Sequence, residues 1–190
     1  YRRILGEFRR GKIDILLGTQ MIAKGLHFPN VTLVGIIYAD LSLHLPDFRP
    51  AERTFQLLTQ VAGRAGRGDV EGEVYVQSLT PFHPAIQYAR RHDFLGFYDQ
   101  EIEFRHELSY PPLARIAIRT LRGRNEEKVA LSADYVRKEL DKTLPSLGEF
   151  IIAGPAPAPL LKAENYFRYQ IMIRGKQMTR LSRALATLNE

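Results

Sequence analysis

The chain has 190 residues and a formal charge of +6, which suits one or two globular domains and an anionic partner such as nucleic acid. It contains no cysteine, so disulfides, cysteine-ligated zinc and cysteine nucleophiles are excluded from it. Its five histidines lack the spacing of a metal site, and we predict no metal ligand. No stretch reaches the roughly 18 apolar residues of a membrane span, so we expect a cytoplasmic protein without membrane contact.

The first 80 residues alternate apolar runs with a helical segment. Residues 13–18 and 31–40 are continuous apolar runs rich in β-branched residues, which predict parallel strands buried on both faces. Residues 51–65 show a helical pattern, and residues 72–79 predict a further strand. This order predicts an α/β unit with a parallel sheet, in which ligands bind at the carboxyl ends of the strands.

Residues 81–110 carry apolar side chains at helical spacing and precede two prolines, which predicts a helical connector. The second domain is predicted to contain a strand, a helix, two strands and a last helix, at residues 114–123, 125–144, 149–159, 165–175 and 177–190. The proline-rich stretch 154–159 predicts a rigid turn. The β-α-β-β-α order predicts a two-layer α+β domain with its helices over one face of the sheet. The predicted domains are 1–80, 81–110 and 111–190.

Acidic residues near the predicted strand end and helix start have two interpretations. Asp40, Asp47 and Glu52 are residue types that hold metals in hydrolytic sites. The favoured interpretation is structural. Asp40 ends a strand and accepts hydrogen bonds in its loop, and Glu52 lies in the first turn of a helix, where the helix dipole favours it.

The stretch QVAGRAGR places Gln60, Arg64 and Arg67 at i, i+4 and i+7, on one face of the predicted helix. Two neighbouring guanidiniums repel unless an anion lies between them, and phosphate suits their planar fork. The glycines between them keep side chains off the flanks, so that another surface can approach. The alternative is that a glycine ends the helix and the arginines are solvated.

This stretch resembles the sixth motif of superfamily-two helicases, Q-x-x-G-R-x-G-R. The resemblance implies a partial second RecA-like lobe, in which Gln60 lies near the nucleotide phosphates. Arg64 and Arg67 would then be arginine fingers that reach the γ-phosphate bound on the opposite lobe. Such fingers are worth about 10³ to 10⁵ in rate. These three are the predicted catalytic residues.

Residues 15–34, ILLGTQMIAKGLHFPNVTLV, resemble the fifth motif of the same superfamily. The resemblance implies that Thr19, Gln20 and Lys24 contact single-stranded DNA, and their polar groups suit a phosphodiester backbone. Gly25 and His27 would lie close to the nucleotide. Many relatives carry an acidic residue where His27 stands, so the role of His27 is open.

Rings and cations interleave in the second domain, a combination that suits nucleic acid. The predicted DNA-binding residues are Lys162, Tyr166, Arg168 and Lys176. Strand alternation predicts one face with Phe167, Tyr169, Ile171 and Ile173, and the other with Arg168, Gln170, Met172 and Arg174. The alternative is an apolar core face with a solvated basic face. Arg122 and Arg124 are interpreted as solvated, with phosphate contact as their alternative.

Residues 18–34, 47–68 and 154–175 are similar, in that order, to the carboxyl-terminal part of the replication-restart (primosomal) helicases. The resemblance implies an ATP-dependent 3′-to-5′ DNA helicase acting on forked or single-stranded DNA. Single-strand-binding protein and primosome proteins would be its partners. ATP and Mg would be bound mainly by a first lobe that this sequence lacks. Zinc is expected in the full-length protein, but this chain has no ligands for it.

The sequence has no Walker A or Walker B motif, and it begins within the second lobe. We therefore expect the chain alone neither to hydrolyse ATP nor to unwind DNA. One alternative is a non-enzymatic module that binds nucleic acid or protein and keeps a decayed lobe; another is a different superfamily-two translocase. Intact Gln60, Arg64 and Arg67 argue against decay, and the stretch DFRPAER with the second domain argues against the other translocase.

Overall fold

The computed structural model describes residues 2–19, 28, 31–63, 65, 72–146 and 149–187. The chain divides into two compact units, Tyr1–Glu101 and Ile102–Glu190. The division falls within the predicted connector, and the predicted domain limits at residues 80 and 110 stay predictions. Among the residues described, no helix has both the length and the apolar character needed to cross a membrane.

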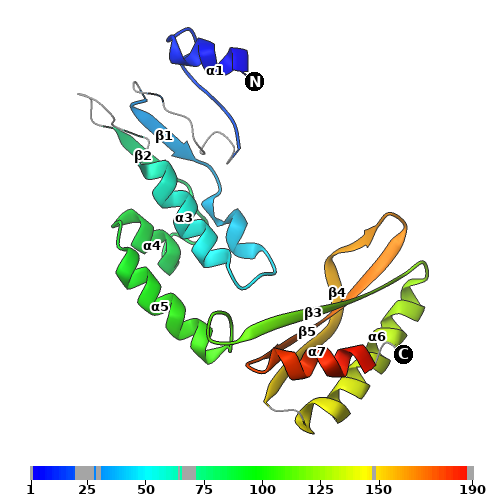
Figure 1. Cartoon of the computed structure of the whole chain (residues 1–190). Coiled ribbons are helices and arrows are strands. Elements are labelled where there is room, and N and C mark those ends of the chain that lie inside the picture. The colour runs from blue at the N-terminus through cyan, green and yellow to red at the C-terminus, as the bar shows by residue number, and fades with distance from the viewer. Residues whose placement is uncertain are drawn as a thin grey trace. The chain divides into compact units, whose positions relative to one another are not determined.

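The first unit is an α/β arrangement built on a two-stranded parallel sheet (Figure 1). Its elements are α1 (Arg2–Arg9), β1 (Leu33–Ile36), the 3₁₀ helix η1 (Ala39–His44), α3 (Pro50–Ala62), β2 (Glu73–Val76), α4 (Pro84–Arg90) and the start of α5 (Phe94–Glu107). The ladder runs from Leu33 opposite Glu73 to Ile36 opposite Val76. The prediction of a parallel sheet is confirmed, with strands shorter than the apolar runs that predicted them.

The predicted strand at residues 13–18 is wrong. This segment is irregular, and the side chains of Ile15 and Leu17 are 76% and 83% exposed. An apolar run becomes a strand only where a neighbouring strand supplies its backbone hydrogen bonds. Among the described residues, β1 and β2 pair only with each other.

Helix α3 carries much of the core of this unit. Pro50 at its first turn has the backbone angle a helix start needs, and Glu52 lies in the same turn, as expected. The buried ring of Phe55 stacks on Phe97 with ring centroids 4.3 Å apart. The core cluster consists of Ala39, Phe55, Leu58, Ala85, Ile86, Ala89 and Phe97. This packing fixes the helix that ends beside the predicted catalytic stretch.

The second unit is a three-stranded antiparallel sheet in the order β3-β5-β4, with two helices. Its elements are β3 (Arg115–Gly123), α6 (Glu126–Thr143), the 3₁₀ turn η2 (Leu144–Ser146), β4 (Phe150–Ala163), β5 (Tyr166–Gly175) and α7 (Met178–Thr187). Helices α6 and α7 lie over one face of the sheet in Figure 1. Their core contains Leu140, Leu144, Ile171, Ile173 and Leu181. The predicted β-α-β-β-α order is confirmed.

Strand β5 shows the predicted alternation. Ile171 and Ile173 are fully buried beneath the helices, whereas Met172 and Arg174 between and beyond them are only partly buried. A strand places alternate side chains on opposite faces, so these two isoleucines assign the helix-covered face. Ile118 of β3 lies opposite Met172 and is 55% exposed, which shows that the other face is open within this unit.

The proline-rich stretch is part of a strand, and the predicted rigid turn there is wrong. Strand β4 continues through residues 154–159, with register shifts between Ala153 and Ala156 and between Pro157 and Lys162. Proline cannot donate a ladder hydrogen bond, so it is accepted in an edge strand or at a bulge, and β4 offers both. The chain reverses at Glu164 and Asn165, whose φ angles are 51° and 64°. Two such residues match a tight hairpin turn.

Candidate nucleic-acid interface

The predicted catalytic stretch begins at the end of α3. Gln60 is exposed in the last turn of the helix. The helix ends at Ala62, and the Gly63 N–H donates to the Thr59 carbonyl at 3.2 Å, so the predicted extension to residue 65 is wrong. Arg64 and Arg67 lie outside the described residues, and their convergence with Gln60 stays a prediction.

The predicted contacts of the fifth-motif stretch are only partly described. Thr19 lies in an irregular, exposed segment, so its hydroxyl is accessible to a ligand. Gln20, Lys24, Gly25 and His27 lie outside the described residues. Their roles as DNA or nucleotide contacts stay predictions.

The carboxyl ends of β1 and β2 are tied together by one buried carboxylate. Asp40 accepts hydrogen bonds from the Ser78 hydroxyl at 2.6 Å, the Leu79 N–H at 2.7 Å, the Thr80 N–H at 3.2 Å and the Thr80 hydroxyl. Hydrogen bonds from the two hydroxyls, and then from the backbone, hold the pKa of Asp40 well below its usual range, although burial opposes them. This confirms the structural interpretation of Asp40.

A second, half-buried polar contact involves His83, which senses the charge of this carboxylate. His83 caps α4, where its Nδ1 accepts the Ala85 N–H at 3.2 Å. Burial lowers the pKa of His83, and the negative charge of Asp40 opposes that effect. A neutral imidazole is required, because a protonated Nδ1 could not accept. Asp40 and His83 therefore hold the loops after the two strands by hydrogen bonds.

Three predicted DNA-binding residues gather at the hairpin end of the second unit, on two faces of the sheet. Lys162 lies opposite Phe167, with its Nζ 4.8 Å from the ring centroid. Tyr166 and Arg168 belong to the opposite face, because they alternate with Phe167. The Arg168 guanidinium donates to the Leu160 carbonyl at 2.6 and 3.0 Å.

Lys176 is separated from the other three. It is exposed directly after the last residue of β5, whereas Tyr166 begins that strand. At about 3.3 Å per residue the two positions are roughly 30 Å apart. Lys176 therefore belongs to a different patch, next to Gln177 and Arg174 at the far end of the sheet.

The structure adds two cations that sequence reasoning had placed in solvent. The guanidinium carbons of Arg122 and Arg124 lie 5.7 and 5.8 Å from the centroid of the Tyr166 ring. Arg122 also lies opposite Arg168 in the ladder. Strand alternation identified the faces of β5, but only the pairing of β3 with β5 brings these arginines to the ring. The pairing register is the signal that was missing.

Comparison with known proteins assigns both units to one lineage. Residues 2–69 match the family described as helicase conserved C-terminal domain, which is RecA-like, and residues 106–190 match the family described as Primosomal protein N C-terminal domain. The chain is 46% identical over 190 residues to Replication restart protein PriA of Bacillus subtilis. It is 42% and 44% identical over 174 residues to the proteins of the same name from Synechocystis and Treponema pallidum.

The chain belongs to the PriA family. All of it aligns with the Bacillus PriA protein and 92% of it with each of the other two. It spans 23%, 21% and 26% of the length of those three relatives, respectively. The match therefore identifies which part of a PriA protein this chain corresponds to: the second helicase lobe and the domain after it.

Metal and nucleotide chemistry have few candidate ligands in this part of PriA. Among the described residues, no cluster of His, Asp and Glu could hold a metal ion, and the whole chain has no cysteine. The described residues therefore offer no ligand set for zinc. For ATP, Gln60 is the one predicted contact within the described part of the chain, and its exposed amide suits a phosphate or sugar oxygen.

Proposed function

We propose that this chain is the C-terminal part of an ATP-dependent 3′-to-5′ DNA helicase that acts in replication restart. The observation that carries the proposal is the match of its two segments to a helicase domain and to the primosomal C-terminal domain, in that order. The shared name of its relatives, Replication restart protein PriA, supports the biological process.

In this proposal the first unit contacts the nucleotide. Gln60, Arg64 and Arg67 would contact phosphates of ATP held mainly, with Mg, by another lobe, and Gly25 and His27 would lie near the same nucleotide. Guanidiniums placed against a transferring phosphoryl group stabilise the charge that it develops. The chain alone would hydrolyse no ATP, because its sequence has no Walker A or Walker B motif.

DNA would be contacted in both units. Thr19, Gln20 and Lys24 would touch the backbone of a single strand, and unit two would add Lys162, Tyr166 and Arg168, with Lys176 as a separate contact. Rings beside cations are the combination that binds exposed bases and phosphates together. Single-strand-binding protein and primosome proteins are the proposed protein partners. Zinc bound elsewhere in the full-length protein and a cytoplasmic location complete the proposal.

The test uses the full-length protein that contains this chain, and measures DNA-stimulated ATP hydrolysis. We expect Arg64→Ala/Arg67→Ala to lower the rate by about 10³-fold or more, as for other arginine fingers. Arg90→Ala/Arg91→Ala is the matched control, since these two exposed arginines are at the end of α4 and belong to neither helicase motif. We expect this control to retain the rate.

Two results would contradict the proposal. ATP hydrolysis by the 190-residue chain alone, above the level of its own Arg64→Ala/Arg67→Ala variant, would refute its dependence on another lobe. An unchanged rate in the full-length double variant would remove the catalytic role, and would favour a non-enzymatic binding module instead.

A further inference from the structure

We propose that Arg122, Arg124 and Tyr166 form a phosphate-binding site at the corner where β3 ends and α6 begins, and that its ligand is the phosphodiester backbone of nucleic acid. The proposal rests on the proposed function for its ligand. It adds two cations that neither motif nor family match assigns, and it locates the contact on the face of the sheet that α6 and α7 do not cover.

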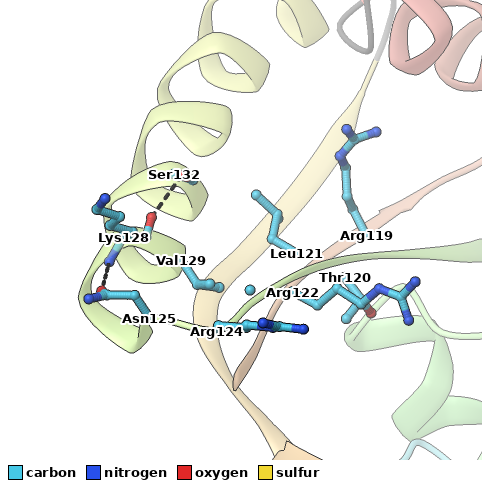
Figure 2. A pocket seen from close by; sticks show the side chains of 10 residues that line it. Arg119, Thr120, Leu121, Arg122, Arg124, Asn125, Lys128, Val129 and Ser132 are labelled. Carbon is cyan, nitrogen blue, oxygen red and sulfur yellow. Dashed lines mark hydrogen bonds between the residues drawn. The ribbon is translucent and has the colours of Figure 1, made fainter. Parts of the chain in front are cut away.

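Arg122 and Arg124 approach the same aromatic ring, that of Tyr166. The guanidinium carbons of both arginines lie within 6 Å of the Tyr166 centroid, at 5.7 and 5.8 Å, and cations at this distance are attracted to the face of an aromatic ring. Figure 2 shows Arg122 and Arg124 extending to one side, with Asn125 and Lys128 on the first turn of α6. A groove of about 650 Å³ lies beside the two arginines, between the end of β3 and the first turns of α6, and Tyr166 is outside its lining.

The charge of the groove is of one sign. Arg122, Arg124 and Lys128 are among its lining residues, and no acidic residue lines it. The first turn of α6 carries Glu126 and Glu127, but neither lines the groove, and Glu126 accepts the Tyr169 hydroxyl at 3.4 Å on the helix-covered face. Arg122 and Arg124 approach the same ring, so their charges repel one another, and a bound anion relieves that repulsion.

The strand register adds to this repulsion. Arg122 lies directly opposite Arg168, and like charges at opposite positions destabilise a sheet. The Arg168 guanidinium is held by the carbonyl of Leu160, which satisfies two donors without neutralising the charge. This like-charged pair destabilises the sheet, and an anion bound near the two guanidiniums would relieve their repulsion. The register therefore favours an anionic ligand here.

The aromatic ring of Tyr166 favours nucleic acid over small anions as the ligand. Arginine forks suit any phosphate oxygen, so the cations alone would accept a free phosphate. Tyr166 adds a partly buried aromatic ring next to the two cations, and base stacking beside backbone contacts is how proteins bind single strands. A polymer with alternating phosphates and bases therefore fits better than a small anion.

The experiment measures fluorescence anisotropy of the 190-residue chain with labelled single-stranded and forked DNA over a salt series. Each phosphate contact contributes about 0.7 to the slope of log K against log salt for a single strand. Arg122→Gln/Arg124→Gln is therefore expected to reduce the slope by about 1.4, and to weaken binding about 10-fold or more at low salt. The matched control is Arg115→Gln/Lys138→Gln, which removes the same charge from exposed positions outside the groove.

A thermal melt separates binding from folding. The groove variant is expected to melt at the same temperature as the parent chain or higher at low salt, because it removes repulsion. A variant that lost DNA binding and melted much lower would show that the arginines are structural, which would overturn the proposal. The conservative variant Arg122→Lys/Arg124→Lys should keep most of the salt slope and lose affinity.

The outcomes distinguish this site from the wider function. If the parent chain binds DNA and the groove variant binds equally well, the proposed site is wrong and the proposed function stands. If the parent chain does not bind DNA, inorganic tripolyphosphate becomes the probe. A rise in the melting temperature of the parent chain but not of the variant would then support a phosphate site. It would overturn both the nucleic-acid ligand of that site and DNA binding by this chain. No shift in either would overturn both.

Discussion

The sheet of the second unit has one face sealed by α6 and α7, whereas the sheet of the first unit leaves apolar side chains of both strands exposed. Ile171 and Ile173 are fully buried, but Leu33 of β1 and Tyr75 of β2 are 58% and 63% exposed. Parallel sheets are normally covered on both faces. The second unit thus has a core of its own, and the first depends more on α3, its neighbouring helices and the Asp40 contacts.

In both units, predicted ligand contacts lie apart from the side chains that form the core. In the first unit, Gln60 is exposed in the last turn of α3, whereas Phe55 and Leu58 of the same helix are in the core. In the second unit, Arg122 and Arg168 lie on the open face of a sheet whose other face is the core. Substitutions on the open face can therefore change binding without unfolding the domain.

The largest expected effect tests whether the second unit is held by its own core. Ile173→Ala should lower the free energy of unfolding of that unit by about 2 to 5 kcal/mol, because it leaves a cavity beneath two helices. Hydrogen exchange in urea, read by mass spectrometry for each unit, measures this. Leu131→Ala is the control, since that side chain on α6 is 63% exposed. A loss below 1 kcal/mol would show that this core is not what stabilises the unit.

A second, smaller effect compares one glycine from each unit. Gly154 in β4 has φ of +91°, and an added Cβ would meet the Gln170 carbonyl oxygen at 2.7 Å. Gly154→Ala should therefore destabilise the second unit by about 2 kcal/mol. Gly35→Ala in β1 meets open space and should leave the first unit within about 0.5 kcal/mol of its parent. Urea melts of both variants check this, and equal effects would remove the contrast.

The smallest expected effect is a difference in acid sensitivity. The folded pKa of His83 is below its ordinary 6.5, so the unfolded chain takes up its proton first, and the first unit loses stability as the pH falls below about 6.5. The folded pKa of Asp40 is also lowered, so its contribution is lost as the pH falls below its ordinary 3.8. Pulse-labelled hydrogen exchange between pH 7 and pH 3 should show the first unit opening earlier.

A matched pair of variants sharpens that measurement. His83→Asn keeps a side-chain oxygen that can cap α4 but has no titrating ring, so it should remove the loss near pH 6 and leave the loss near pH 4. Asp40→Asn should weaken the first unit already at pH 7. If the amide oxygen accepts from the Ser78 and Thr80 hydroxyls, the amide nitrogen faces the Leu79 N–H and cannot accept from it. If the second unit opened first in the parent chain, the comparison would be wrong.

The sequence by itself determined the features that are written in local patterns. The alternation along 165–175 identified the buried face of β5, the spacing along 125–144 identified α6, and the helicase and primosomal motifs identified the family. Each of these depends on a period of side chains along one element, or on a run of residues, and needs no knowledge of what lies beside it.

Tertiary structure alone decided what depends on a neighbour. Residues 13–18 have the composition of a strand but no partner in the described structure, and the prolines at 155–159 stay in a strand because β4 is an edge. Arg122 meets Tyr166 because β3 pairs with β5, and Lys176 is separated from it by the length of that strand. Strand pairing joins residues that are distant in sequence, so a local period cannot encode it.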